Sequence, residues 1–129
     1  MLPDELLNNV FTYLKSVGGL PKIFYPNINY TTIPSEYIIV NIMPIEPDDI
    51  GIKEVTMNGG LIQIDCVTLD GMGALRASEI AKIIINAFKR GTVISGIRID
   101  RTSYASQGFN DGAGHYKIPV TIAYNFLTA

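Results

Sequence analysis

A glycine-containing segment holds the first residues that could do chemistry, the run Asp70-Gly71-Met72-Gly73-Ala74-Leu75-Arg76. It follows an apolar, strand-like run and opens a stretch with helical periodicity, which is where dinucleotide-binding proteins hold a pyrophosphate. That fingerprint requires a third glycine, but Arg76 stands in its place. The acidic residue expected about 20 residues further on is also missing, because Asp100 comes too late. We therefore interpret Gly71 and Gly73 as a turn between strand and helix, and we expect no cofactor.

Histidine and cysteine each occur once, as His115 and Cys66. A single histidine cannot form a histidine-rich metal site. A nucleophilic cysteine needs a histidine within hydrogen-bond reach in a cleft, and nothing in the sequence indicates such a pair. We expect His115 to be a solvated strand residue and Cys66 to be a small core hydrophobe. A lone cysteine cannot form an intramolecular disulfide, which points to a reducing cytoplasm.

Carboxylates are the remaining candidates, and they fall into two groups. One group lies in an acidic segment and the other near the ends of expected strands: Glu46, Asp48, Asp49 and Glu54, then Asp65, Asp70, Asp100 and Asp111. Paired carboxylates acting as acid and base, or as cation ligands, stay open as an alternative. The acidic segment lacks the alternating spacing and the glycine of a calcium-binding loop. We interpret it as a solvated loop, and we predict no catalytic and no metal-binding residues.

Size and composition indicate a single folded domain spanning residues 1–129. The chain is 47% hydrophobic and 17% charged, which is far from the composition of disordered chains. The net charge is -2 and no run of Lys or Arg could follow a phosphate backbone, so we expect no nucleic-acid recognition. No apolar run approaches the roughly 18 residues of a membrane-spanning helix, so we expect no membrane partner.

Periodicity predicts two helices and four strands. The helices are expected at 3–17 and 72–89, and the strands at 36–45, 61–69, 97–101 and 115–125. Three prolines between 20 and 35 predict an extended connector instead of a regular element. Residues 46–55 are expected to form a protruding loop. Pro119 lacks a ladder donor, so the last strand should lie at an edge or leave that position unpaired.

This order of elements predicts an α+β fold. We expect a small mixed or antiparallel sheet of about four strands, with two helices packed on one face. The other face must then be in water or covered by a partner. Seven tyrosines, several of them on expected strands, suit protein contacts better than chemistry.

Several pieces of the chain, taken in order, resemble a known family. They are F-Y-P-N-I-N-Y, Y-I-I-V-N-I-M-P, G-G-L-I-Q-I-D-C-V, A-S-E-I-A-K-I-I-I-N-A-F, G-I-R-I and D-G-A-G-H-Y-K-I-P-V-T-I-A-Y. Together they resemble the tail-terminator, or tail-completion, proteins of long-tailed bacteriophages and a related prophage tail domain. The resemblance covers nearly the whole chain, and its most specific parts are residues 60–65 and 116–120.

The resemblance implies a structural protein of the virion tail, assembled in the bacterial host cytoplasm, and not an enzyme. Such proteins form a ring, typically a hexamer, on the end of the tail tube. The ring stops the addition of tube subunits and presents a surface to the head connector. The partners implied are therefore further copies of the chain, the tail tube protein and the head connector or neck protein.

The acidic segment is our candidate for contact with a tail partner, because its isoleucines have no obvious core to join. The candidate residues are Pro47, Asp48, Asp49, Ile50, Lys53 and Glu54. Two alternatives stay open. One is another neck, head-tail joining or minor tail protein, which would differ in its partner. The other is a small nucleotide-binding enzyme built on the glycine segment, which would bind phosphate at the amides of residues 71–74.

Overall fold

Three long antiparallel strands form the centre of the sheet. The computed structural model describes residues 3–24, 34–49, 55–69, 71 and 74–128. Strands β2 (Glu36–Asp49), β3 (Thr56–Leu69) and β8 (His115–Thr128) each span 14 residues and lie side by side in that order. β3 pairs with β8 without interruption, whereas the β2–β3 register shifts between Ile45 and Asp48. Such a shift marks a bulge, which bends a strand and increases its twist.

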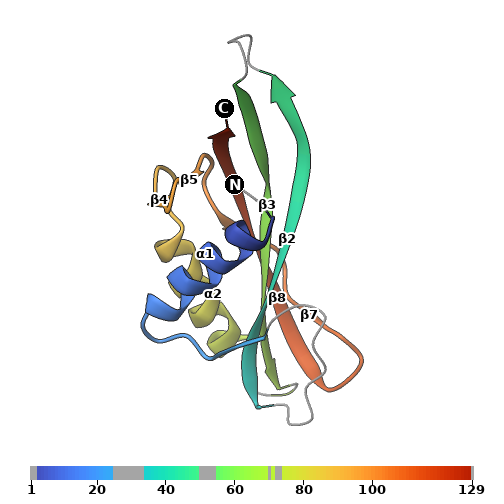
Figure 1. The fold of residues 1–129 in the computed structure, drawn as a ribbon. Helices are drawn as coiled ribbons and strands as arrows, with labels where there is room; N and C mark the ends of the chain where they lie inside the picture. Colours follow the sequence, from blue (N-terminus) through green and yellow to red (C-terminus); the bar gives the residue numbers. More distant parts are fainter. Residues whose placement is uncertain (1–2, 25–33, 50–54, 70, 72–73, 129) are drawn as a thin grey trace.

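Five short strands extend this centre on both sides. They are β1 (Lys22–Phe24), β4 (Val93–Ile94), β5 (Ile97–Ile99), β6 (Tyr104–Ala105) and β7 (Phe109–Asn110). β1 runs parallel to β2, and the sheet continues in the order β1-β2-β3-β8-β5-β4. β6 and β7 also pair with β8. The described residues therefore form one curled, mixed sheet of eight strands (Figure 1).

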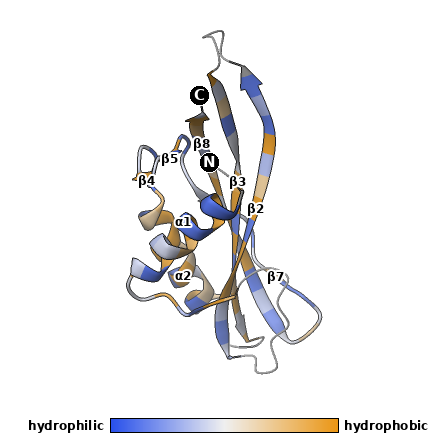
Figure 2. Cartoon of the chain, viewed as in Figure 1, coloured by the Kyte–Doolittle hydropathy of each residue, from blue (hydrophilic) through white to orange (hydrophobic). Residues whose placement is uncertain are grey.

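Two helices complete the fold, α1 (Pro3–Ser16) and α2 (Leu75–Ala87). Leu6, Val10 and Leu14 of α1 recur at helical spacing and are buried, and so are Ala77, Ile80 and Ile84 of α2. The hydroxyl of Tyr13 donates a hydrogen bond to the Ala87 carbonyl at 2.6 Å, and its ring meets Phe88 edge-on. Apolar colour is concentrated where the helices meet the sheet (Figure 2).

Alternation along the long strands separates two faces. Even-numbered side chains join the helices in the main core: Ile38, Val40, Ile62, Ile64, Cys66, Ile118, Val120, Ile122 and Tyr124. Odd-numbered side chains lie on the opposite face. There Phe24, Tyr37 and Val67 form a second, smaller cluster, in which the rings of Phe24 and Tyr37 stack at 4.3 Å between centroids.

The predicted sheet of about four strands with two helices packed on one face is wrong. Eight strands are present among the described residues, and the sheet curls into half a barrel. The four strands that were missed are two or three residues long. Elements that short show no periodicity, and pairing with a long neighbour is what makes them strands.

Two segments predicted to be irregular contain strands. β2 continues to Asp49, so residues 46–49 of the predicted loop at 46–55 belong to a strand, with Asp48 opposite Met57, while residues 50–54 lie outside the described part. β1 lies in the predicted connector, of which residues 25–33 are outside the described part. Pairing across the ladder overrides the turn-like composition of both segments.

Pro119 does not mark an edge, because β8 lies between β3 and the strands β5, β6 and β7. β6 pairs with β8 at Val120 and Thr121, and β7 pairs with it at Tyr116 and Lys117. Pro119 falls in the interval between them, where its carbonyl accepts a hydrogen bond from the Ser106 amide at 2.8 Å. A proline is tolerated there because no ladder donor is required.

The long strands extend past the helices at one end of the molecule (Figure 1). We call this part the strand projection, and define it as residues 42–49 of β2, 56–61 of β3 and 123–128 of β8.

Candidate assembly surface

The glycine segment leads into α2 by way of Gly71, whose φ of 85° is a conformation that glycine adopts easily. Residues 70, 72 and 73 lie outside the described part. The predicted helix start at Met72 is not described, and α2 begins at Leu75 without a side-chain cap on Ala74. The first turn of α2 instead places Arg76, the residue standing where a third glycine would be, over the start of β2.

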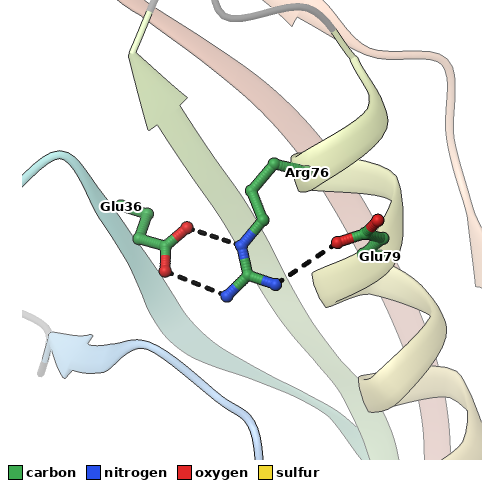
Figure 3. Close-up of polar contacts among 3 residues, drawn as sticks. All are labelled: Glu36, Arg76 and Glu79. Carbon is green, nitrogen blue, oxygen red and sulfur yellow. Dashed lines mark hydrogen bonds and ion pairs between the residues drawn. The ribbon is translucent and has the colours of Figure 1, made fainter.

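Arg76 forms a paired contact with Glu36 (Figure 3). Its Nε donates to Oε2 at 2.7 Å and its Nη2 donates to Oε1 at 2.9 Å, while Nη1 lies 3.5 Å from Oε2 of Glu79. The hydrogen bonds from Arg76 hold the pKa of Glu36 below its ordinary value. Those to Glu36 raise the pKa of Arg76. This corner therefore joins α2 to β2.

Cys66 and His115 lie on opposite faces of the sheet. Cys66 is fully buried on the helix face, and burial raises the pKa of its thiol to about 12. His115 is half-buried on the other face, with its ring edge-on to Tyr37 at 5.8 Å between centroids. The prediction of Cys66 as a core hydrophobe is confirmed, whereas His115 is less solvated than expected. The two side chains cannot act as a nucleophilic pair.

The carboxylates are dispersed through the described part of the chain. Among those residues, no group of three or more His, Cys, Asp or Glu side chains could hold a metal ion. Asp65 accepts a hydrogen bond from Gln63 at 3.2 Å, and Asp100 accepts one from Asn125 at 3.0 Å. Asp70 and Glu54 lie outside the described residues.

Asp111 organises the turn before β8. Its Oδ1 accepts hydrogen bonds from the amides of Ala113 and His115, at 2.7 and 3.1 Å, and its Oδ2 lies 3.9 Å from Lys117 Nζ. The bond from Ala113 has the largest effect in lowering the pKa of this carboxyl. Gly112 and Gly114, with φ of 80° and 90°, supply the left-handed conformations that the turn needs. The aspartate is thus part of the turn itself.

Exposed apolar side chains gather on the projection, on the face opposite the helices. We call them, together with the half-buried Leu61, the apolar band: Met43, Ile45, Met57, Leu61 and Leu127. Met43 lies opposite Leu61, and Met57 lies opposite Leu127, so the band crosses three neighbouring strands. Ile45 and Leu127 are each 59% exposed, and Met43 and Met57 about 40%. A contiguous exposed group of this kind is typical of a surface that meets another protein.

A hollow of about 210 Å³ opens beside the band. Ile45, Met57 and Leu61 line it together with Gly59, which contributes no side chain. The carboxylates of Glu46, Asp48 and Asp100 and the guanidinium of Arg101 also line it. One oxygen of Asp100, Oδ1, is buried and accepts no hydrogen bond from the described residues. The hollow is therefore lined by both apolar and charged residues, and three of the four charged residues are acidic.

The partner-contact candidates are only partly described. Pro47 and Asp48 are exposed at the tip of β2, and Asp49 is its last residue. Ile50, Lys53 and Glu54 lie outside the described residues. Sequence reasoning missed the apolar band, because apolar residues on both faces of 36–45 are also typical of a central strand. The apolar residues at the odd-numbered positions of this segment were the sequence signal that could have indicated the band.

None of the described helices is long and apolar enough to cross a membrane. Among proteins with curated descriptions, none matches this chain. Two of the solved structures that share its fold cover more than nine-tenths of this chain. One is 20% identical, with 98% of this chain and 96% of that chain covered and a TM-score of 0.68. The other belongs to the virion of a native gene transfer agent particle, at 16% identity, 92% of each chain covered and a TM-score of 0.64.

The family of phage tail terminator proteins matches residues 7–124, which is nearly the whole chain. The match includes all of the sheet except the last residues of β8, all of α2 and most of α1. This chain belongs to the phage tail terminator family.

Proposed function

We propose that copies of this protein form a ring, typically a hexamer, that caps the tail tube, ends its polymerisation and presents a surface to the head connector. Membership of the family makes the chain a structural protein of phage tail assembly and a virion component. The ring, its partners and its assembly in the cytoplasm of a bacterial host are our proposal. We also propose that it works without catalysis.

The observation that carries the proposal is the apolar band on the strand projection. Four of its side chains are 40–59% exposed, and burying exposed apolar area is what drives most protein association. The band lies on a rigid three-stranded ladder and not on a loop, so it presents a fixed shape to a partner. A protein that works by docking requires such a surface.

The tip of the projection is the proposed contact with the tail tube. Pro47 and Asp48 are exposed there, and Asp49, Ile50, Lys53 and Glu54 follow in the sequence. In the sequence, residues 47–54 combine acidic and apolar residues, which suits a partner surface with a basic rim.

Tube length measures capping directly. Purified tail tube protein is polymerised with and without this protein, and the tubes are measured by electron microscopy. Wild-type protein should give short, closed tubes, while a variant lacking residues 47–54 should fold and leave the tubes long. Leu75→Ser, which changes an exposed apolar residue at the start of α2, outside the strand projection, is the matched control and should still cap.

Tubes that grow to the same length with and without the wild-type protein would exclude the capping role. Binding to a purified head connector but not to tail tubes would instead favour a neck or head-tail joining protein.

A further inference from the structure

The two edges of the sheet carry opposite charge. At one edge, β4 and β5 with the turn before them carry Lys89, Arg90, Val93 and Arg98, all of them exposed. We call this the cationic edge. Val93 is 65% exposed and lies directly opposite Arg98 in the ladder. At the other edge, the distal half of β2 carries exposed Glu46 and Asp48 beside Met43 and Ile45, which we call the acidic edge.

The charges of both edges are uncompensated within the described part of the chain. Among the described residues, no residue of either edge takes part in the ion pairs formed by Arg76, His115 and Lys117. By contrast, Arg76 is paired twice. Three cations within ten residues, next to an exposed valine, indicate a surface that a partner of opposite charge would complete.

Both edges lie at the same level along the strands. Ile45 of β2 is opposite Gly59 of β3, which is opposite Asn125 of β8. Asn125 is opposite Arg98 of β5, which is opposite Val93 of β4. One row of paired residues therefore joins the acidic edge to the cationic edge. A head-to-tail contact between them needs little displacement along the strands, so successive copies can close into a ring instead of winding into a filament.

We propose that the acidic edge of one copy docks on the cationic edge of a second copy, so that the sheets of neighbouring subunits follow one another around the ring. This rests on the ring of the proposed function and names the surfaces that form it. Glu46 and Asp48 pair with Lys89, Arg90 and Arg98 of the next copy, and Val93 packs against the apolar residues beside them. In this contact, each edge neutralises the charges of the other and covers its exposed apolar residues.

Side chains, and not a continuous hydrogen-bonded ladder, make this contact. Pro44 and Pro47 on β2 have no amide hydrogen to donate, and β4 is only two residues long. Proline at a strand edge blocks indiscriminate strand addition. Specificity then depends on charge, which makes the contact sensitive to salt.

Charge reversal tests the contact. One variant carries Glu46→Lys and Asp48→Lys, and the other carries Lys89→Glu, Arg90→Glu and Arg98→Glu. Each has two edges of the same sign, so self-association measured by analytical ultracentrifugation at low salt should weaken by roughly tenfold or more. An equimolar mixture restores alternate pairing at every contact, so it should associate like the wild type.

Glu5→Lys and Lys82→Glu are the matched controls, because they reverse exposed charges on the helices and should leave association unchanged. Melting curves establish that every variant is folded. The contact is overturned if either reversal has no effect, if the mixture fails to associate, or if the wild type stays monomeric at about 1 mM. If the wild type caps tubes but the charge reversals leave its self-association unchanged, this contact alone is overturned. If the wild type self-associates through these edges but leaves tube length unchanged, the capping role is overturned.

Discussion

Arg76 and Glu36 join the first turn of α2 to the first residue of β2 through two nearly parallel hydrogen bonds, of 2.7 and 2.9 Å. The planar guanidinium matches the two carboxylate oxygens, which a lysine at the same position could not do. The residue that breaks the dinucleotide-binding pattern is therefore a structural connector between helix and sheet.

Replacing Arg76 with lysine should lower the free energy of unfolding by about 0.5–1 kcal/mol, because the pair is about one-third exposed and water weakens it. Glu79→Gln removes only the 3.5 Å contact and is the matched control, with an expected loss of less than about 0.5 kcal/mol. Urea unfolding monitored by circular dichroism measures both. Equal losses in the two variants would show that the paired geometry contributes nothing.

The same pair predicts a dependence of stability on pH. The hydrogen bonds from Arg76 lower the pKa of Glu36 in the folded protein from its ordinary value of 4.5. The stabilisation is therefore complete above pH 4.5, and is lost as pH falls through the lower folded-state value. Glu36→Gln should lie below the wild type in stability at pH 7 and approach it at low pH. If the stabilities of the two proteins changed in parallel from pH 7 to low pH, the assignment of this pH dependence to Glu36 would be contradicted.

The sequence predicts an element well when the residues that determine it lie within that element. It predicts an element poorly when pairing with a distant strand determines it. α1 was predictable because its apolar residues recur at helical spacing and Gly18 and Gly19 follow them. The distal part of β2 was not, because Pro47 and Asp48 have turn-like composition. Only pairing with Thr56 and Met57, on another strand, makes that segment extended.

The candidate surface was predictable in charge but not in shape. Glu46 and Asp48 stood out as solvated acids, and the structure leaves both exposed. Met43, Met57 and Leu127 could be recognised as apolar, but the same residues would suit a core. Their common face depends on the register of three strands, which no local pattern encodes.

The thiol of Cys66 should be unreactive in the folded protein. The side chain is fully buried, and its pKa of about 12 leaves almost no thiolate at pH 8. Labelling with a thiol reagent should therefore follow global unfolding, and its rate should rise with urea in step with the unfolded fraction. Fast labelling in native buffer would mean that the helix-covered core opens without unfolding.

Gly60 should be the least replaceable of the non-turn glycines on the long strands. A Cβ there would lie 2.5 Å from the Met43 carbonyl oxygen and 2.7 Å from the Tyr124 hydroxyl, so the backbone of β2 and the tyrosine ring would both have to move. Gly60→Ala should destabilise the protein by about 1–3 kcal/mol. Gly18→Ala, where a Cβ meets nothing within 4 Å, should change stability by less than about 0.5 kcal/mol. Thermal unfolding of the two variants compares a blocked position with an open one. If Gly60→Ala unfolded at the same temperature as the wild type, the close packing of Tyr124 against β3 would be refuted. The inference that this packing makes the strand projection rigid would be refuted as well.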